Sequence, residues 1–158
     1  MTDTIRIRRA NYDDAGLIAD QRYLMFKDMD PESDATALQS MRDVAFVWTQ
    51  KMLEQGVYLG WFLVDEATEQ VVGGAGMWLL DWCPNPDDLI ANHGYIINVY
   101  VIPAYRRRGL AKRLMTTILN YCQHHQITLV SLHSSPMGRT LYESLGFNAT
   151  NEMQIELT

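Results

Sequence analysis

The chain has 158 residues, of which 47% are hydrophobic and 20% charged, and its 13 basic and 19 acidic residues give a formal net charge of −6. We expect one globular domain, residues 1–158, because this composition suffices to bury a core. Nucleic-acid binding needs a broad basic surface, and a membrane helix needs an apolar run of ~20 residues, so neither partner is expected. The two cysteines and the absence of an apolar signal core predict reduced thiols and a cytoplasmic location.

Hydrophobic periodicity divides the first half of the chain into a strand, two helices and a hairpin. Ile5 and Ile7 alternate with charged residues, as in a half-buried strand. Apolar residues spaced by three and four predict the helices. In chain order, the expected elements are a strand (4–9), a helix capped by Asn11, a polar loop (27–36), a helix that ends at Gly56, and two hairpin strands (57–64 and 71–80).

The second half predicts a central strand followed by alternating helices and strands. Residues 95–102 are almost continuously apolar and β-branched, which is typical of a strand buried on both faces. The other expected elements are a loop with prolines (82–88), a helix (109–122), a buried strand (127–132), a short helix capped by Ser135 and closed by Gly146, and final strand material (147 and 153–157). The order β-α-α-β-β-β-α-β-α-β predicts a mixed α/β sheet with helices on its faces.

A cluster of cations stands out in this acidic chain, at the turn from the central strand into the next helix. It surrounds Gly109 and consists of Arg106, Arg107, Arg108, Lys112 and Arg113. The first backbone amides of a helix attract anions, and a glycine lets a ligand approach the backbone closely. One arginine guanidinium can donate to two phosphate oxygens at once. The pattern indicates a pyrophosphate site, with a solvated basic turn as the alternative. Neither an NTPase phosphate loop nor a dinucleotide fingerprint is present.

Two motifs resemble the GNAT superfamily of N-acetyltransferases. "RRRGLA", residues 106–111, resembles the family's Arg/Gln-x-x-Gly-x-Gly/Ala motif, and "LYESLGF", residues 141–147, resembles its Tyr-x-x-x-Gly-Phe element. The resemblance extends over nearly the whole chain. It implies a single GNAT-type domain with a mixed, mostly antiparallel central sheet flanked by helices. It also implies an enzyme that transfers an acetyl group from acetyl-CoA to an amine of a small molecule or protein, by direct attack in a ternary complex.

The resemblance further implies where acetyl-CoA is held. The pantetheine arm would pair with the central strand near Val99 and Val101. Ser135 stands where many relatives carry a cofactor-contacting Asn, with helix capping as the alternative, and Arg139 either reaches the cofactor or lies on the helix surface. The pyrophosphate would bind the motif itself, at Arg106, Arg107, Arg108, Gly109, Leu110, Ala111 and Lys112.

Tyr142 matches the family's general-acid tyrosine, which protonates the leaving thiolate, and a place in the core is the alternative. His133 is the candidate base because histidine titrates near neutral pH. Other readings remain open. His93 and Asn98, by or on the central strand, could hold a water, and the loop that helps to wall the substrate site in this family carries Asp28, Asp30 and Glu32. No His or Cys spacing matches a metal motif, so no metal is expected.

Three functions compete on the sequence alone. A non-catalytic acyl-CoA sensor would share the cofactor site, although Tyr142 favours an enzyme. A nucleotide- or phosphate-binding regulator would need a base-recognition element that the sequence lacks. The acidic loop between the first two helices favours a cationic small-molecule acceptor. A homodimer is possible, and Trp82 either lines a pocket, contacts a second subunit or packs in the core.

Overall fold

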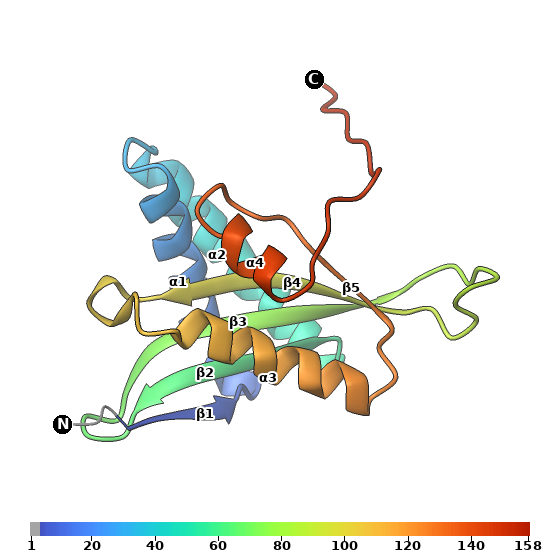
Figure 1. Cartoon of the computed structure of the whole chain (residues 1–158). Coiled ribbons are helices and arrows are strands. Elements are labelled where there is room, and N and C mark those ends of the chain that lie inside the picture. The colour runs from blue at the N-terminus through green and yellow to red at the C-terminus, as the bar shows by residue number, and fades with distance from the viewer. Residues whose placement is uncertain (1–3) are drawn as a thin grey trace.

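The computed structural model describes residues 4–158, which form one five-stranded sheet with helices on both faces (Figure 1). The strands follow one another across the sheet in chain order. Neighbours from the first strand to the fourth are antiparallel, and the fourth and fifth are parallel, which confirms the expected mixed, mostly antiparallel sheet. The strands are β1 (Ile5–Arg9), β2 (Tyr58–Asp65), β3 (Gln70–Asp81), β4 (Asn92–Val101) and β5 (Leu129–Leu132).

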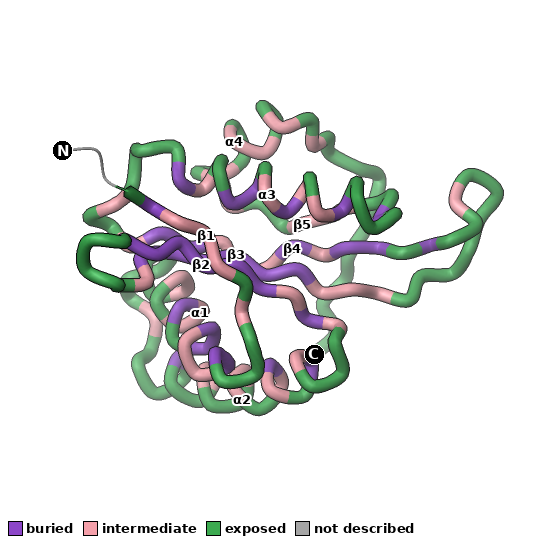
Figure 2. Tube along the Cα trace, turned by 90° about the horizontal axis from the view of Figure 1, so that it is seen from below, coloured by how far each residue is buried: buried purple, intermediate pink, exposed green. Residues whose placement is uncertain are grey.

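The helices divide between the two faces of the sheet. Figure 2 shows α1 and α2 on one side of the strands and α3 and α4 on the other. Their bounds are α1 (Ala15–Met29), α2 (Ala35–Glu54), α3 (Leu110–His124) and α4 (Arg139–Ser144), with short 3₁₀ turns η1 (Tyr12–Asp14) and η2 (Pro103–Tyr105). The predicted helices are present, but α1 extends to Met29, so the loop before α2 is shorter than expected.

The entry into α1 is stabilised by a capping box and an ion pair. The Asn11 side chain accepts from Asp13 N at 2.9 Å, and the Asp14 carboxylate accepts from Asn11 N at 2.8 Å. Asn11 therefore caps the 3₁₀ turn η1 rather than the α-helix directly. Arg8 donates to both Asp14 oxygens at 2.8 and 2.9 Å, and this guanidinium holds the pKa of Asp14 below its usual range.

Two hydrophobic clusters fill the two sides of the sheet. On the α3 face, the fully buried Leu114, Met115 and Ile118 pack against side chains of β2, β3 and β4. The cluster on the α1/α2 face is smaller and contains Ile18, Met52, Tyr58, Phe62 and Val64. Each cluster has its own helices, so the sheet separates two distinct cores.

The four tryptophans are spread over these regions. Trp48 of α2 packs edge-on against Trp78 of β3 at 5.5 Å between ring centroids, on the α1/α2 face. Trp61 packs edge-on against Tyr121 of α3 at 5.5 Å, on the opposite face. Trp82 is exposed at the start of the loop between β3 and β4.

Strand β4 has a bulge near its middle. Ile97 pairs with Gly76 and Tyr100 with Gly74, so β4 carries one more residue than β3 across this step. Asn98 lies in the bulge with φ of 60°, a left-handed conformation that asparagine tolerates better than most residues. Strand β5 pairs with β4 only from His93 to Ile96, so beyond the bulge the two strands are no longer hydrogen-bonded.

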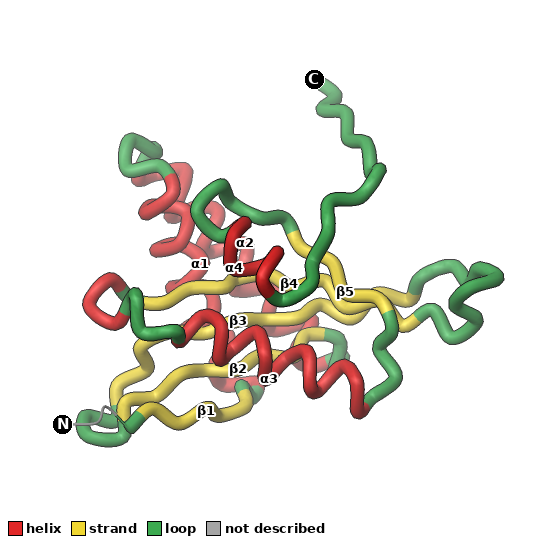
Figure 3. Tube along the Cα trace, in the orientation of Figure 1, coloured by secondary structure: helices red, strands yellow, loops and turns green. Residues whose placement is uncertain are grey.

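The expected final strand is absent from the described residues, and that prediction was wrong. Figure 3 shows the segment after α4 as a loop that leads away from the sheet. Residues 153–157 alternate apolar and polar side chains as a strand does, but their backbone has no strand partner in the described chain. Alternation specifies two faces and leaves the pairing partner open, so the sheet ends at β5.

Candidate cofactor and acceptor site

The turn from β4 into α3 is shaped for an anion. Arg107 and Gly109 have φ of 62° and 72°, and Gly109 is the N-cap of α3. A Cβ added at Gly109 would meet no atom within 4 Å, so its backbone faces open space. Leu110 is buried and anchors the first turn, and Ala111 is half-buried beside it. The exposed first amides of α3 can therefore be approached by a phosphate group.

Arg106 is held by the strand and by α1. Its Nε donates to the Val101 carbonyl at 2.7 Å, and its guanidinium forms an ion pair with Asp28 at the end of α1. The same guanidinium lies 5.6 Å from the centre of the Tyr100 ring. Arg106 therefore joins α1 to the end of β4, in addition to any contact it makes with a ligand.

Three further cations, Arg107, Arg108 and Lys112, are exposed around the turn, and the fifth, Arg113, is exposed on the first turn of α3. Arg108 donates to the Ala104 carbonyl at 3.0 Å and its guanidinium lies 4.8 Å from the centre of the Tyr105 ring. Arg107 and Lys112 are exposed on either side of Gly109. These three side chains, with Arg106, keep a high positive charge density at the start of α3.

Past the bulge, backbone groups of β4 face the side where β5 has diverged and form no strand pairing there. The Ile102 amide donates to the Val72 carbonyl at 2.9 Å, toward β3. Because backbone groups alternate along a strand, those of Val99 and Val101 face the opposite, open edge. The bond from Arg106 to the Val101 carbonyl agrees with this direction. An extended ligand with amide groups can pair there as an additional strand.

A buried polar network lies at the bulge on the α1/α2 face. The Asn98 side chain donates to the Tyr58 hydroxyl at 3.0 Å and accepts from Arg22 Nη1 at 2.8 Å. Burial raises the pKa of Tyr58 to about 12, so this hydroxyl stays protonated at neutral pH. Desolvation lowers the pKa of Arg22, whose guanidinium also lies 4.9 Å from the centre of the Phe26 ring. Sequence reasoning proposed Asn98 as a water-holding residue and missed Arg22.

Tyr142 and His133 line the same groove, which has a volume of about 380 Å³. Tyr142 is half-buried on α4, edge-on to Phe147 at 5.9 Å, and burial raises the pKa of its hydroxyl. His133 is exposed just after β5, and its Nδ1 contacts the Tyr95 hydroxyl. Arg139 also lines the groove and bonds Glu143 one turn further along the helix at 2.7 Å. The structure therefore brings together the two predicted catalytic residues.

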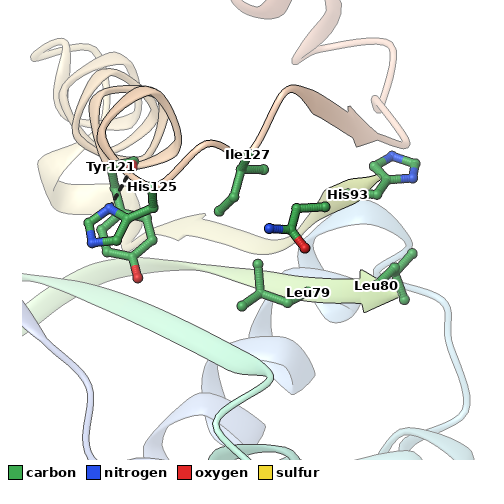
Figure 4. Close-up of a pocket in the computed structure, with 7 residues that line it drawn as sticks. Leu79, Leu80, His93, Tyr121, His125 and Ile127 are labelled. Atoms are coloured by element: carbon green, nitrogen blue, oxygen red, sulfur yellow. Dashed lines mark hydrogen bonds between the residues drawn. The ribbon is translucent and has the colours of Figure 1, made fainter. Parts of the chain in front are cut away.

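His93 lies apart from that groove, although sequence reasoning proposed it as a residue that could hold a water. It is buried, its Nε2 contacts the Ser131 hydroxyl at 2.8 Å, and burial lowers its pKa. It lines a separate cavity of about 130 Å³ between α3, β3 and β4, and Figure 4 shows its ring pointing away from Tyr121 and His125. A neutral histidine in this place is a packing residue.

The other candidates serve local structure. Asp28 pairs with Arg106, and Asp30 Oδ1 accepts from Glu32 N at 3.1 Å within the loop. Ser135 Oγ accepts from Gly138 N at 3.2 Å, so Ser135 caps a turn that precedes α4, and the helix begins later than the sequence indicates.

No group of three or more His, Cys, Asp or Glu side chains in residues 4–158 is placed to hold a metal ion. No helix in the same residues is long and apolar enough to cross a membrane.

Comparison with known proteins agrees with this geometry. Residues 23–147 match the model of the acetyltransferase (GNAT) family, while no curated protein matches the chain. A GCN5-related N-acetyltransferase from Ralstonia eutropha JMP134 is 30% identical, with a TM-score of 0.86 over 98% of this chain and 99% of that one. A predicted acetyltransferase with acetyl-CoA from Clostridium acetobutylicum is 23% identical, with a TM-score of 0.82 over 98% and 96%. Glucosamine-6-phosphate N-acetyltransferase from Arabidopsis thaliana is 15% identical, with a TM-score of 0.68 over 98% of both chains. The motif at Gly109, the divergence of β4 and β5 and these matches lead to one conclusion: the chain belongs to the GNAT acetyltransferase family.

Proposed function

We propose that this protein is an acetyl-CoA-dependent N-acetyltransferase that acetylates an amine by direct attack in a ternary complex. The observation that carries the proposal is the open edge of β4, because β5 pairs with it only from His93 to Ile96. That edge leads directly to the turn at Gly109. A ligand with an extended, amide-containing arm and a pyrophosphate fits both features in one stretch of chain.

The cofactor would be held mainly by backbone groups. Val99 and Val101 would pair with the amides of the pantetheine arm, and the amides from Arg107 to Lys112 would bind the pyrophosphate. Leu110 and Ala111 position this first turn from beneath. Arg106 and Arg108 would balance the phosphate charge from the rim, since guanidinium groups bind phosphate oxygens in pairs.

Side chains at the groove would extend this site. Arg139 reaches the groove from α4, where it would meet either the cofactor or the acceptor. Ser135 accepts from Gly138 N as a cap, and its hydroxyl proton would still be able to donate to the cofactor.

The chemistry requires two proton movements. The amine nitrogen attacks the thioester carbonyl carbon, the carbon–sulfur bond breaks, and the electron pair leaves on sulfur. Tyr142 would give the thiolate its proton, and the raised pKa of its hydroxyl keeps that proton in place at neutral pH. His133 would take the proton that the amine loses. The Tyr95 hydroxyl contact at Nδ1 would fix the orientation of the imidazole ring.

The acceptor is an amine of a small molecule or of a protein. Asp30 and Glu32 are exposed in the loop after α1 and favour a cationic acceptor. Arg22 adds one positive charge at the bulge on the α1/α2 face. Amines that also carry an anionic group are therefore a second class of acceptor to test. No nucleic-acid partner is proposed, and a cytoplasmic location rests on the reduced, two-cysteine composition.

A screen with acetyl-CoA tests this function. Cationic small amines, amines with a carboxylate or phosphate, and peptide N-termini are offered in turn, and released CoA is followed through its free thiol. We expect at least one class to release CoA well above the hydrolytic background. Calorimetry with CoA runs in parallel. If CoA binds but no acceptor releases CoA above the background, the non-catalytic acyl-CoA sensor is favoured. If CoA does not bind, both the enzyme and the sensor are refuted.

A further inference from the structure

Arg22 is a half-buried cation on α1 whose charge is not balanced by the protein around it. Its Nη1 donates to Asn98 Oδ1 at 2.8 Å, so the guanidinium lies at the bulge of β4. Within residues 4–158 it forms no ion pair with a carboxylate. Arg106, which also joins α1 to β4, has the Asp28 carboxylate as its partner. The two arginines therefore differ in that only Arg106 is neutralised by its neighbour.

The surroundings of Arg22 are those of a site that lacks its anion. The groups beside it are neutral: the Asn98 amide, the Tyr58 hydroxyl and the Phe26 ring, whose centre lies 4.9 Å away. Desolvation lowers the pKa of Arg22, which shows that burial disfavours the charge. A guanidinium withdrawn from water is normally paired with an anion, because an uncompensated charge is costly there. A guanidinium has five N–H groups, and Asn98 occupies one, so donors remain for a second partner.

The position of Arg22 connects it to the acceptor rather than to the cofactor. In the proposed site the pyrophosphate lies at Gly109, and the pantetheine arm runs back along β4 past Val101 and Val99. The thioester at the end of that arm would then lie beside the bulge at Asn98. Arg22 is bonded to Asn98 at this same place, far along the strand from the phosphate groups. An anion held by Arg22 would therefore belong to the molecule that reacts with the thioester.

We propose that the acceptor is an amine that also carries a carboxylate, as amino acids do, and that Arg22 binds this carboxylate. The inference rests on the proposed acetyltransferase function and names its substrate class. A planar guanidinium can donate to both oxygens of a carboxylate at once. The amine nitrogen gains the acetyl group and loses a proton, the thioester carbon–sulfur bond breaks, and the sulfur takes up a proton. Because the amine arrives as an ammonium ion, the exposed Asp30 and Glu32 agree with such a zwitterionic acceptor.

The first experiment compares amino acids with the corresponding amino acid amides, which keep the amine and lose the carboxylate charge. Both sets are offered with acetyl-CoA, and released CoA is followed. Arg22→Met should raise KM for the acids by about 10–100-fold, as expected for one lost charge-assisted contact, and should leave KM for the amides unchanged. Each acceptor is compared with itself in the two proteins, so differences in amine pKa between acids and amides cancel. Arg22→Lys keeps the charge without the planar fork and should lie between the two, and it replaces Arg22→Met if that variant does not fold.

Arg42→Met is the matched control. Arg42 of α2 lies 5.4 Å from the centre of the Phe46 ring, four residues further on, just as Arg22 lies over Phe26. Arg42 has carboxylate partners, however, at Asp20 and Asp43. Its substitution should leave the preference for acids over amides as it is. An equal loss for acids and amides in Arg22→Met would make Arg22 a structural partner of Asn98 and overturn the proposal, as would an unchanged KM for the acids.

A binding measurement separates this inference from the proposed function. Calorimetry follows the binding of N-acetylated amino acids to the complex with CoA and needs no turnover. If no amine releases CoA, the acetyltransferase function fails. The carboxylate site then stands if Arg22→Met binds these acids about tenfold or more weakly than the wild type, and it falls if the two proteins bind alike or not at all. If amines without a carboxylate are the better acceptors and do not respond to Arg22→Met, the enzyme stands and the amino acid acceptor is overturned. A response confined to aminoalkylphosphonates would overturn it too, because the anion would then be a phosphate group.

Discussion

The two faces of the sheet are built differently. On the α3 face, Leu114, Met115 and Ile118 are fully buried and contact other apolar side chains. On the α1/α2 face, the apolar cluster shares its space with the hydrogen-bonded Arg22, Asn98 and Tyr58. Figure 2 shows buried chain on both sides of the strands. The first face is a hydrophobic core, and the second combines packing with polar groups beside the bulge in β4.

The difference concerns what each face can tolerate. Removing atoms from a purely apolar core lowers the free energy of unfolding, but it leaves no polar group without a hydrogen-bond partner. A buried polar network is sensitive to the loss of any one member, because its partners then stay unpaired. The α1/α2 face therefore depends on every member of the polar network beside the bulge in β4. The following predictions are ordered by expected size.

Tyr142→Phe tests the proposed general acid, which lies on α4. The substitution removes one oxygen and keeps the ring against Phe147. Turnover should fall by roughly 10²–10⁴-fold, as for a lost general acid, whereas melting temperature and CoA affinity should hardly change. Steady-state kinetics with the best acceptor measures this. Equal turnover in both proteins would make Tyr142 a packing residue, and a fall in affinity or folding of the same size would leave it without a catalytic role.

Ile118→Ala should destabilise the α3 face by about 2–5 kcal/mol, because Ile118 is fully buried in the larger cluster and the cavity would not refill. Urea unfolding measures the change. Val44→Ala is the control, since Val44 is exposed on α2 and its truncation should change stability by less than about 0.5 kcal/mol. Similar losses in the two variants would show that the cluster is not the main source of stability.

Asn98→Ala should cost about 1–3 kcal/mol, because it leaves Tyr58 and Arg22 without their partner. Asn98→Gly removes the same hydrogen bonds but suits the left-handed backbone at this position. If the hydrogen bonds dominate, both variants lose stability in urea unfolding. Recovery in the glycine variant would instead assign the loss to the backbone conformation.

Gly109→Ala should cost about 1–2 kcal/mol, since a left-handed residue with a side chain is strained. Gly56→Ala is a close control: its φ is 70°, and an added Cβ would also meet nothing within 4 Å. The two stability losses should match, but only Gly109→Ala should weaken CoA in calorimetry, and Gly109→Val should weaken it further. Normal CoA affinity in a folded Gly109→Val would move the phosphate site elsewhere.

The Arg8–Asp14 pair should give the smallest effect, visible as a function of pH. The Arg8 guanidinium lowers the pKa of the folded Asp14 carboxyl, so the pair stabilises the fold above the ordinary value of about 4. That stability is lost as the pH falls through the lowered folded pKa. Urea unfolding between pH 2 and pH 7, a range set by the ~4 reference value, should show a smaller acid-side decline in Asp14→Asn. Asp20→Asn, whose carboxylate is largely exposed in its pair with Arg42, should keep the original profile.

The elements of the fold were predictable because their signals are local. The spacing of apolar residues located α1, α2, α3 and the first five expected strands within a few positions, whereas α4 was located by its expected cap and closing glycine. Residues 153–157 were predicted as a strand and are not one in the structure, because the alternation of apolar and polar residues does not specify a pairing partner. Likewise, the turn at Gly109 could be found from its own sequence, whereas Arg22, Tyr58 and Asn98 could not be connected. They come from α1, β2 and β4, and only the packing of α1 on the sheet brings them together.

Because the tryptophans lie in different regions of the molecule, their intrinsic fluorescence can report on each region separately. Trp48 and Trp78 report on the α1/α2 face, Trp61 on the α3 face, and Trp82 on the exposed loop between β3 and β4. In variants that keep the tryptophans of only one region and carry phenylalanine at the other tryptophan positions, the wavelength of the fluorescence emission would report on that region alone. A ligand that binds beside the polar network would then shift the emission of the variant that keeps Trp48 and Trp78. The emission of the variant that keeps Trp61 would stay constant.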